Sequence, residues 1–188
     1  MAEEKRTIAD CVHIAFGYVQ RSNKAISKIP KQDRAALRED IERLIVRCLD
    51  NFFMLNLSGQ DDFDAWHGKV CSDVLKAAEM TDNSFTYGIA QYLLNFTLEE
   101  MLITEWAEQL EPIKKYLHVP VYSKTIQAAW EDMEIVLLCK NGAADSKSWK
   151  QWDYSEYTAF QEAVRNAVPC PIDWGHSLCI NDNTEGAL

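Results

Sequence analysis

The stretch FTYGIAQYLLNF, from Phe85 to Phe96, is apolar on almost every side when it is wound as a helix. An ordinary surface helix has one apolar stripe and one polar face, so a helix without a polar face is expected to be buried all round. We therefore expect this stretch to form the central helix of the domain. The segments before and after it are then expected to form helices that cover it.

The flanking segments have the spacing of half-buried helices. Apolar residues recur at three- and four-residue intervals around 8–19, 37–53, 63–75, 98–110, 126–137 and 157–164. The polar residues 81–84 and 141–146 are typical of loops, and Val119-Pro120-Val121 is too short for a central strand. The sequence predicts an all-α fold, a compact bundle of six to seven helices. Residues 1–180 are expected to form a single helical domain, and residues 181–188 a flexible tail.

Composition favours a cytoplasmic location. No apolar run approaches the ~20 residues that a membrane-spanning helix needs, so no membrane is expected as a partner. The charged start of the chain, MAEEKR, leads into no signal-type apolar stretch. The six cysteines are expected to be reduced, because most of them lie within apolar helical periodicity. P-loop, GxGxxG and HExxH motifs are absent, so we expect no cofactor.

The net charge of −10 makes duplex DNA an unfavourable ligand. Lys24, Lys28 and Lys31 form the most basic local stretch, which is either a phosphate-contacting loop or a solvated linker. The five glutamates at 99, 100, 105, 108 and 111 indicate a solvated helix face. As a continuous acidic ridge, they would instead present a DNA-like row of charge to a basic protein.

Two groups of residues invite the prediction of a site. Cys170, His176 and Cys179 lie close together, but their spacing matches no common zinc module, so no metal is predicted. Three tryptophans, Trp66, Trp106 and Trp130, fall on apolar stripes and are expected in the core. The other three, Trp149, Trp152 and Trp174, lie in or beside loops, where they either line a pocket or clamp the C-terminal segment onto the domain.

Three short motifs resemble those of a known group. The stretches YGIAQYLLN (87–95), LHVPVY (117–122) and PIDW (171–174) resemble a pattern of uncharacterised bacterial and phage helical proteins. That group is in turn similar to the helix-hairpin-helix DNA glycosylases of the 8-oxoguanine type. The resemblance implies a glycosylase-like helical fold and a setting in phage–host defence or counter-defence.

This sequence departs from the group at the two positions that carry the lyase chemistry. In those glycosylases a lysine attacks the anomeric carbon of the sugar and an aspartate stabilises the cationic transition state. The matching positions here are Tyr92 and Tyr122. A phenol with a pKa near 10 forms no Schiff base and is neutral at pH 7. The resemblance thus implies the scaffold without catalytic residues, with Lys124 as a substitute nucleophile by proximity alone.

A degenerate glycosylase-like fold would keep a cleft between its helical halves. The residues that we expect to line it are Gln91, Tyr92, His118, Tyr122, Lys124 and Trp174. Our leading hypothesis is a non-catalytic binding protein for a partner protein or a small nucleotide-type ligand, which would be held by stacking and amide hydrogen bonds. One alternative is a nucleic-acid repair or modification enzyme that uses Lys124, Asp132 or Asp173. Another is an acidic DNA mimic that inhibits a nucleic-acid-binding protein.

Overall fold

The computed structural model describes residues 5–22, 26, 29–55, 57–79, 85–135 and 148–185, with the backbone alone for Ser22, Glu79 and 179–185. Helices account for nearly all of its regular structure, and no strand occurs in these ranges, so the predicted all-α class is confirmed. The elements are α1 (Ile8–Ser22), α3 (Lys31–Phe52), α4 (Gln60–Glu79), α5 (Tyr87–Leu102), α6 (Ala107–Leu110), the 3-10 helix η1 (Glu111–Tyr116), α7 (Ser123–Met133), the 3-10 helix η2 (Trp149–Gln151), α8 (Tyr154–Ala167) and α9 (Pro171–Glu185).

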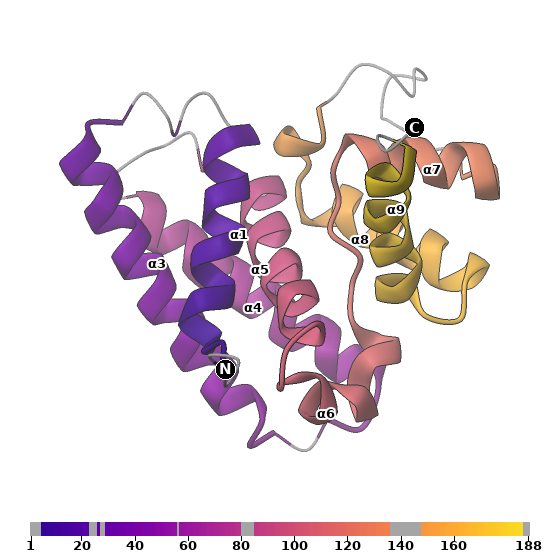
Figure 1. Cartoon of the computed structure of the whole chain (residues 1–188), viewed down its shortest axis with the longest axis horizontal. Helices are drawn as coiled ribbons and strands as arrows, with labels where there is room; N and C mark the ends of the chain where they lie inside the picture. Colours follow the sequence, from indigo (N-terminus) through magenta and orange to yellow (C-terminus); the bar gives the residue numbers. More distant parts are fainter. Residues whose placement is uncertain are drawn as a thin grey trace.

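The helices form two groups on opposite sides of α5. Figure 1 shows α1, α3 and α4 on one side of it and α7, α8 and α9 on the other. An extended segment, residues 117–121, runs between α5 and the second group. Within the described residues, no helix is both long enough and apolar enough to cross a membrane.

Helix α5 is the buried centre of the fold, as its apolar circumference predicts. Every residue from Tyr87 to Glu99 is buried. The hydroxyl of Thr86 caps its start by accepting from the Ile89 amide. Glycine is required at Gly88, because a Cβ there would lie 2.2 Å from the carbonyl oxygen of Trp149 in η2. This close approach lets η2 pack directly onto the first turn of α5.

The segment after Phe96 differs from the expectation. Two helices were expected, over 85–96 and 98–110, but α5 continues without a break to Leu102. The reason is that Thr97, at the expected boundary, is buried and donates its hydroxyl to the Leu93 carbonyl within the helix (2.8 Å). The real break follows Leu102, and the short α6 comes after it. The expected solvated face is therefore wrong for Glu99, which is buried. The other glutamates lie on both sides of this break, which argues against the alternative of one continuous acidic ridge.

The C-terminal segment is a helix rather than a loop. Pro169-Cys170-Pro171 ends α8 as expected, but Pro171 also opens α9, because the first position of a helix tolerates a residue without an N–H group. Gly175 of α9 packs so closely on the extended segment that a Cβ would lie 2.3 Å from Val119 Cγ2. Helix α9 continues to Glu185, so the predicted tail begins inside it.

The set of tryptophans that are buried differs from the expectation. Trp130 was expected in the core but is 56% exposed on α7, so that prediction is wrong: the helix turns its small residues Ala128 and Ala129 inward instead. Trp149 and Trp152, predicted to be clamps or pocket walls, are buried against Tyr92 and Phe160 respectively. The expected loops at 81–84 and 141–146, together with Lys24 and Lys28, lie outside the described residues.

Candidate functional site

Three of the predicted cleft residues, Gln91, Tyr92 and Tyr122, come together. The rings of Tyr92 and Tyr122 are in contact, with their centroids 5.8 Å apart. Gln91 is bound to the backbone of Val121, donating from Nε2 to its carbonyl (3.2 Å) and accepting its amide at Oε1 (3.4 Å). Where the resemblance would put a lysine and a carboxylate, two phenol rings therefore pack on each other.

The other three predicted residues lie apart from this contact. The ammonium of Lys124 donates to the carbonyl oxygen of Leu178 (2.6 Å) and so ties α7 to α9. Trp174 is half-buried on α9 against the apolar core. His118 belongs to a group of polar side chains that is joined to Gln91 through Asn95, whose Nδ2 donates to Gln91 Oε1 (3.1 Å).

We call this group the buried polar cluster, and it consists of Asp64, His67, Asn95, His118 and Tyr157. Its hydrogen-bond partners allow one consistent proton assignment. His118 donates from Nε2 to Asp64 Oδ1 (2.7 Å), and its Nδ1 accepts the hydroxyl proton of Tyr157 (2.7 Å). The Tyr157 oxygen accepts from Asn95 Nδ2 (2.9 Å), and Asn95 Oδ1 accepts from His67 Nε2 (2.8 Å). Helices α4, α5 and α8 and the extended segment are joined by this one chain of bonds.

The side chain of Gln161 binds the backbone of the extended segment. Gln161 of α8 accepts from the Val119 amide (3.1 Å) and donates to its carbonyl (2.7 Å), so one side chain replaces a missing strand partner. Because a buried backbone group without a partner is costly, these bonds explain how an irregular segment crosses the core.

The electrostatics of the cluster fix its protonation. Burial lowers the pKa of His118, and that of His67 well below its usual value, while burial raises the pKa of Tyr157 well above its usual value. Burial also acts to raise the pKa of Asp64, but hydrogen bonds from His118 and Gln60 and the charge of Arg165 outweigh it and lower that pKa to about 2. The cluster therefore holds one carboxylate, two neutral imidazoles and a neutral phenol at pH 7.

The two imidazoles and the phenol of the cluster do not reach solvent. His67, His118 and Tyr157 are each about 1% exposed. Asp64 is partly exposed, but Arg165 lies 3.3 Å from its Oδ2 and pairs with it. The arrangement is chemically suited to holding the extended segment in place rather than to attacking a substrate.

Sequence reasoning missed most of this cluster, although a signal was present. Gln91 and Asn95 are amides within the mostly apolar stretch 85–96, and His67 lies on the apolar face of α4 beside Val70 and Val74. A polar side chain on a face that the pattern marks as buried needs a partner. That signal indicates a network without identifying its members.

The candidate metal ligands have other partners. His176 Nδ1 lies 3.3 Å from Glu99 Oε1, and the Cys170 thiol faces the Lys114 carbonyl (3.8 Å). The side chain of Cys179 lies outside the described residues. Across the part of the chain that the structure describes, no three His, Cys, Asp or Glu side chains are grouped to hold a metal ion.

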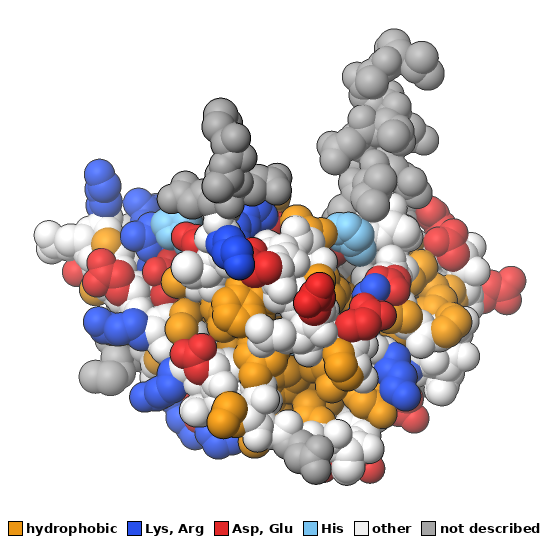
Figure 2. All heavy atoms as spheres, turned by 60° about the horizontal axis from the view of Figure 1, so that its bottom comes forward, with side chains coloured by type: hydrophobic (Ala, Val, Ile, Leu, Met, Phe, Trp, Pro, Cys, Tyr) orange, Lys and Arg blue, Asp and Glu red, His pale blue; other side chains and the backbone are white. Residues whose placement is uncertain are grey.

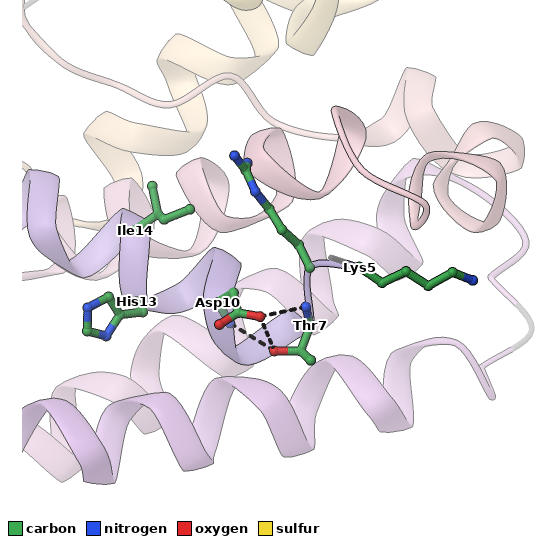
Figure 3. Close-up of a pocket in the computed structure, with 6 residues that line it drawn as sticks. Lys5, Thr7, Asp10, His13 and Ile14 are labelled. Carbon is green, nitrogen blue, oxygen red and sulfur yellow. Dashed lines mark hydrogen bonds between the residues drawn. The ribbon is translucent and has the colours of Figure 1, made fainter. Parts of the chain in front are cut away.

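A shallow hollow lies at the start of α1, as Figure 3 shows. Asp10 Oδ2 accepts from both the amide (2.8 Å) and the hydroxyl (2.7 Å) of Thr7, so a side chain of the protein already satisfies this end of the helix. Lys5 and His13 point away from this hydrogen-bonded pair in Figure 3. The hollow therefore has no converging donors for an anion.

Exposed apolar side chains gather at one end of the molecule. We define the end patch as the exposed Met54, Leu55 and Ile103 together with the half-buried Phe53, Leu102 and Trp106. Trp106, which was expected in the core, is thus only partly buried. Met54 is 86% exposed, Ile103 54% and Leu55 48%. Phe53 and Trp106 join the two halves of the patch, because their rings stack at 5.8 Å and 17°. Figure 2 shows a band of hydrophobic side chains on this face, next to the connection between α3 and α4.

The sequence contained a weak signal for the end patch. Met54 and Leu55 follow directly on Phe52 and Phe53, so the apolar run continues past the helix and cannot all face inward. Comparisons of the chain with protein-family models, with curated proteins and with solved structures found no match.

Proposed function

We propose that this chain is a non-catalytic binding protein that recognises a partner protein through the end patch. The observation that carries the proposal is the exposure of Met54, Leu55 and Ile103 just after the ends of α3 and α5, which the stacked rings of Phe53 and Trp106 bring together. Scattered single apolar residues on a surface need no explanation, but a contiguous exposed group marks an interaction site in many proteins. The stacked pair Phe53 and Trp106 supplies the large, rigid aromatic surface that interfaces favour.

The closed packing at the predicted cleft supports a protein rather than a nucleotide-type ligand. Gln91 and Asn95 use their amide groups on the extended segment and on each other, and so have little left to offer a nucleobase. The contact between Tyr92 and Tyr122 supports a function without lyase chemistry, because two phenols occupy the positions where the resemblance would put the lysine and the carboxylate. A DNA-mimic function draws less support, because Glu99 is turned into the protein.

A cytoplasmic site of action is part of the proposal. Cys11, Cys48, Cys71 and Cys170 are free thiols, and Cys11 and Cys71 are buried. Reduced, buried thiols are typical of proteins kept in a reducing compartment.

Site-specific photo-crosslinking tests the proposed function. A photoreactive phenylalanine analogue is placed at Met54, at Ile103 and, as a control, at the exposed Glu162 of α8, and cells that express each variant are irradiated. We expect discrete heavier adducts from positions 54 and 103 but not from 162. Equal adduct patterns at all three positions would overturn the proposal. A thermal-shift screen with nucleotides accompanies it, and marked stabilisation there would favour the small-ligand alternative.

A further inference from the structure

The end patch is surrounded by carboxylates. Asp50 lies one helical turn before Met54, Asp61 lies in the first turn of α4, and Glu105 and Glu108 flank Trp106. All four are exposed, and none has an ion-pair partner among the residues that the structure describes. Of the two cations at the start of the chain, Arg6 pairs with Glu100 (3.4 Å), and the exposed Lys5 next to it is outnumbered by the four carboxylates.

The helix ends add negative potential at the same place. Helices α3 and α5 both end at the end patch, and neither has a basic residue in its last turn. The C-terminal end of a helix carries partial negative charge, which basic residues usually offset. Helices α1 and α4 begin near this end of the molecule, where Asp10 offsets the positive end of α1 and Asp62 that of α4, so Asp61 is a second carboxylate in that turn. The carboxylates and the two uncompensated helix ends therefore both add negative potential at the end patch.

Resting on the proposed function, we infer that the end patch binds a basic amphipathic segment of the partner protein. The apolar face of that segment packs against Met54, Ile103 and the stacked aromatic pair. Its lysines and arginines face the surrounding carboxylates, which speeds association and excludes acidic or neutral partners. A helix that lays its apolar face on a hydrophobic surface is a common mode of peptide recognition.

A second copy of this chain is a poorer occupant. A symmetric dimer would bring the same patch of both copies together, and with it the two sets of carboxylates. Each copy carries a net charge of −10, so their approach would be opposed by repulsion rather than helped by attraction.

The test uses synthetic peptides as probes for the full-length protein. The basic peptide is an amphipathic helix of leucine and lysine of about 18 residues, or five turns. One matched peptide replaces each lysine with glutamate, and another has the basic composition in scrambled order. Binding is measured by fluorescence anisotropy at low and at high salt. We expect the basic amphipathic peptide to bind more tightly than the other two. Its affinity is expected to fall as salt is added.

Two pairs of variants locate the binding. Glu105→Lys with Glu108→Lys reverses charge beside the patch, whereas Glu39→Lys with Glu162→Lys makes the same change in net charge elsewhere on exposed helix faces. We expect the first pair to weaken binding at least ten-fold and the second less than about two-fold, since ten-fold corresponds to about 1.4 kcal/mol. Met54→Ser with Ile103→Ser, which changes no charge, is expected to weaken binding as much as the first pair.

Several outcomes would overturn the inference. Equal weakening by both charge pairs would mean attraction to net charge alone, and equal binding of the scrambled peptide would exclude an amphipathic ligand. A dimer in sedimentation that Met54→Ser abolishes would identify a second copy as the occupant. If no peptide binds while positions 54 and 103 still crosslink in cells, the inference of a basic amphipathic ligand is wrong and the proposed function stands. Failure of both experiments removes the proposed function as well.

Discussion

The hydroxyl of Tyr157 is the residue-scale feature on which the buried polar cluster depends. It donates to His118 Nδ1 and accepts from Asn95 Nδ2, at a position about 1% exposed. Tyr157→Phe leaves both partners buried without this bond, so we expect a loss of about 1–3 kcal/mol in the free energy of unfolding, measured with urea. The control is Tyr154→Phe in the same helix, where the ring is half-exposed. Equal losses from the two variants would contradict the assigned role.

Gly88 offers a second test at this scale. An alanine Cβ would meet the backbone oxygen of Trp149, and backbone cannot move aside as a flexible side chain can. We expect Gly88→Ala to destabilise the protein by about 1–3 kcal/mol, as overpacking of a core does, despite the higher helix propensity of alanine. Gly59→Ala is the matched control, because nothing lies within 4 Å of its added Cβ. A neutral effect at both positions would show that η2 does not pack on α5 as described.

At the scale of elements, the contact of α9 with α5 depends on pH through Glu99. Burial raises the pKa of this carboxyl to about 7, although His176 on α9 acts to lower it. Because the folded protein then holds a proton that the unfolded chain, with a pKa near 4.5, has released, stability is expected to fall as pH rises from about 4.5 to about 7. Glu99→Gln removes this titration. Its urea midpoint should vary less with pH over that range than that of the wild type, and parallel profiles would contradict the role of Glu99.

The elements themselves were largely predictable from local periodicity, and the exceptions have physical causes. The start of α9 was missed because Pro171 is compatible both with the end of one helix and with the start of another. The break after Phe96 was misplaced because the buried bond of Thr97 to Leu93 keeps the helix intact. The exposure of Trp130 follows from tertiary packing of α7, which favours the small Ala128 and Ala129 inward.

The candidate site was less predictable than the elements, because it depends on contacts between distant parts of the chain. Asp64, Asn95, His118 and Tyr157 come from three helices and a loop, and no local pattern specifies that they meet. The end patch depends in turn on the contact between Phe53, which follows α3, and Trp106, which follows α5. Sequence reasoning placed Tyr92 and Tyr122 near each other, but it could not show that their rings are in contact.

The charge of the whole molecule leads to a prediction about nucleic acid. With a net charge of −10, the protein is expected to show no retention of duplex or single-stranded DNA in a mobility-shift assay, even at low salt. Retention that weakens with added salt would favour the alternative of a repair or modification enzyme. In that case, borohydride trapping on lesion-containing DNA, with Lys124→Ala for comparison, would test for a Schiff base.

The central claim, that a protein partner covers the end patch, is tested most directly by methionine labelling in cells. Met54 is highly exposed, Met133 is half-buried and Met101 is fully buried, so the chain carries its own internal references. With the purified protein, a methionine-selective reagent should modify Met54 fastest. In cells, the account predicts that modification of Met54 slows several-fold relative to Met133. An unchanged ratio of Met54 to Met133 between purified protein and cells would contradict the account.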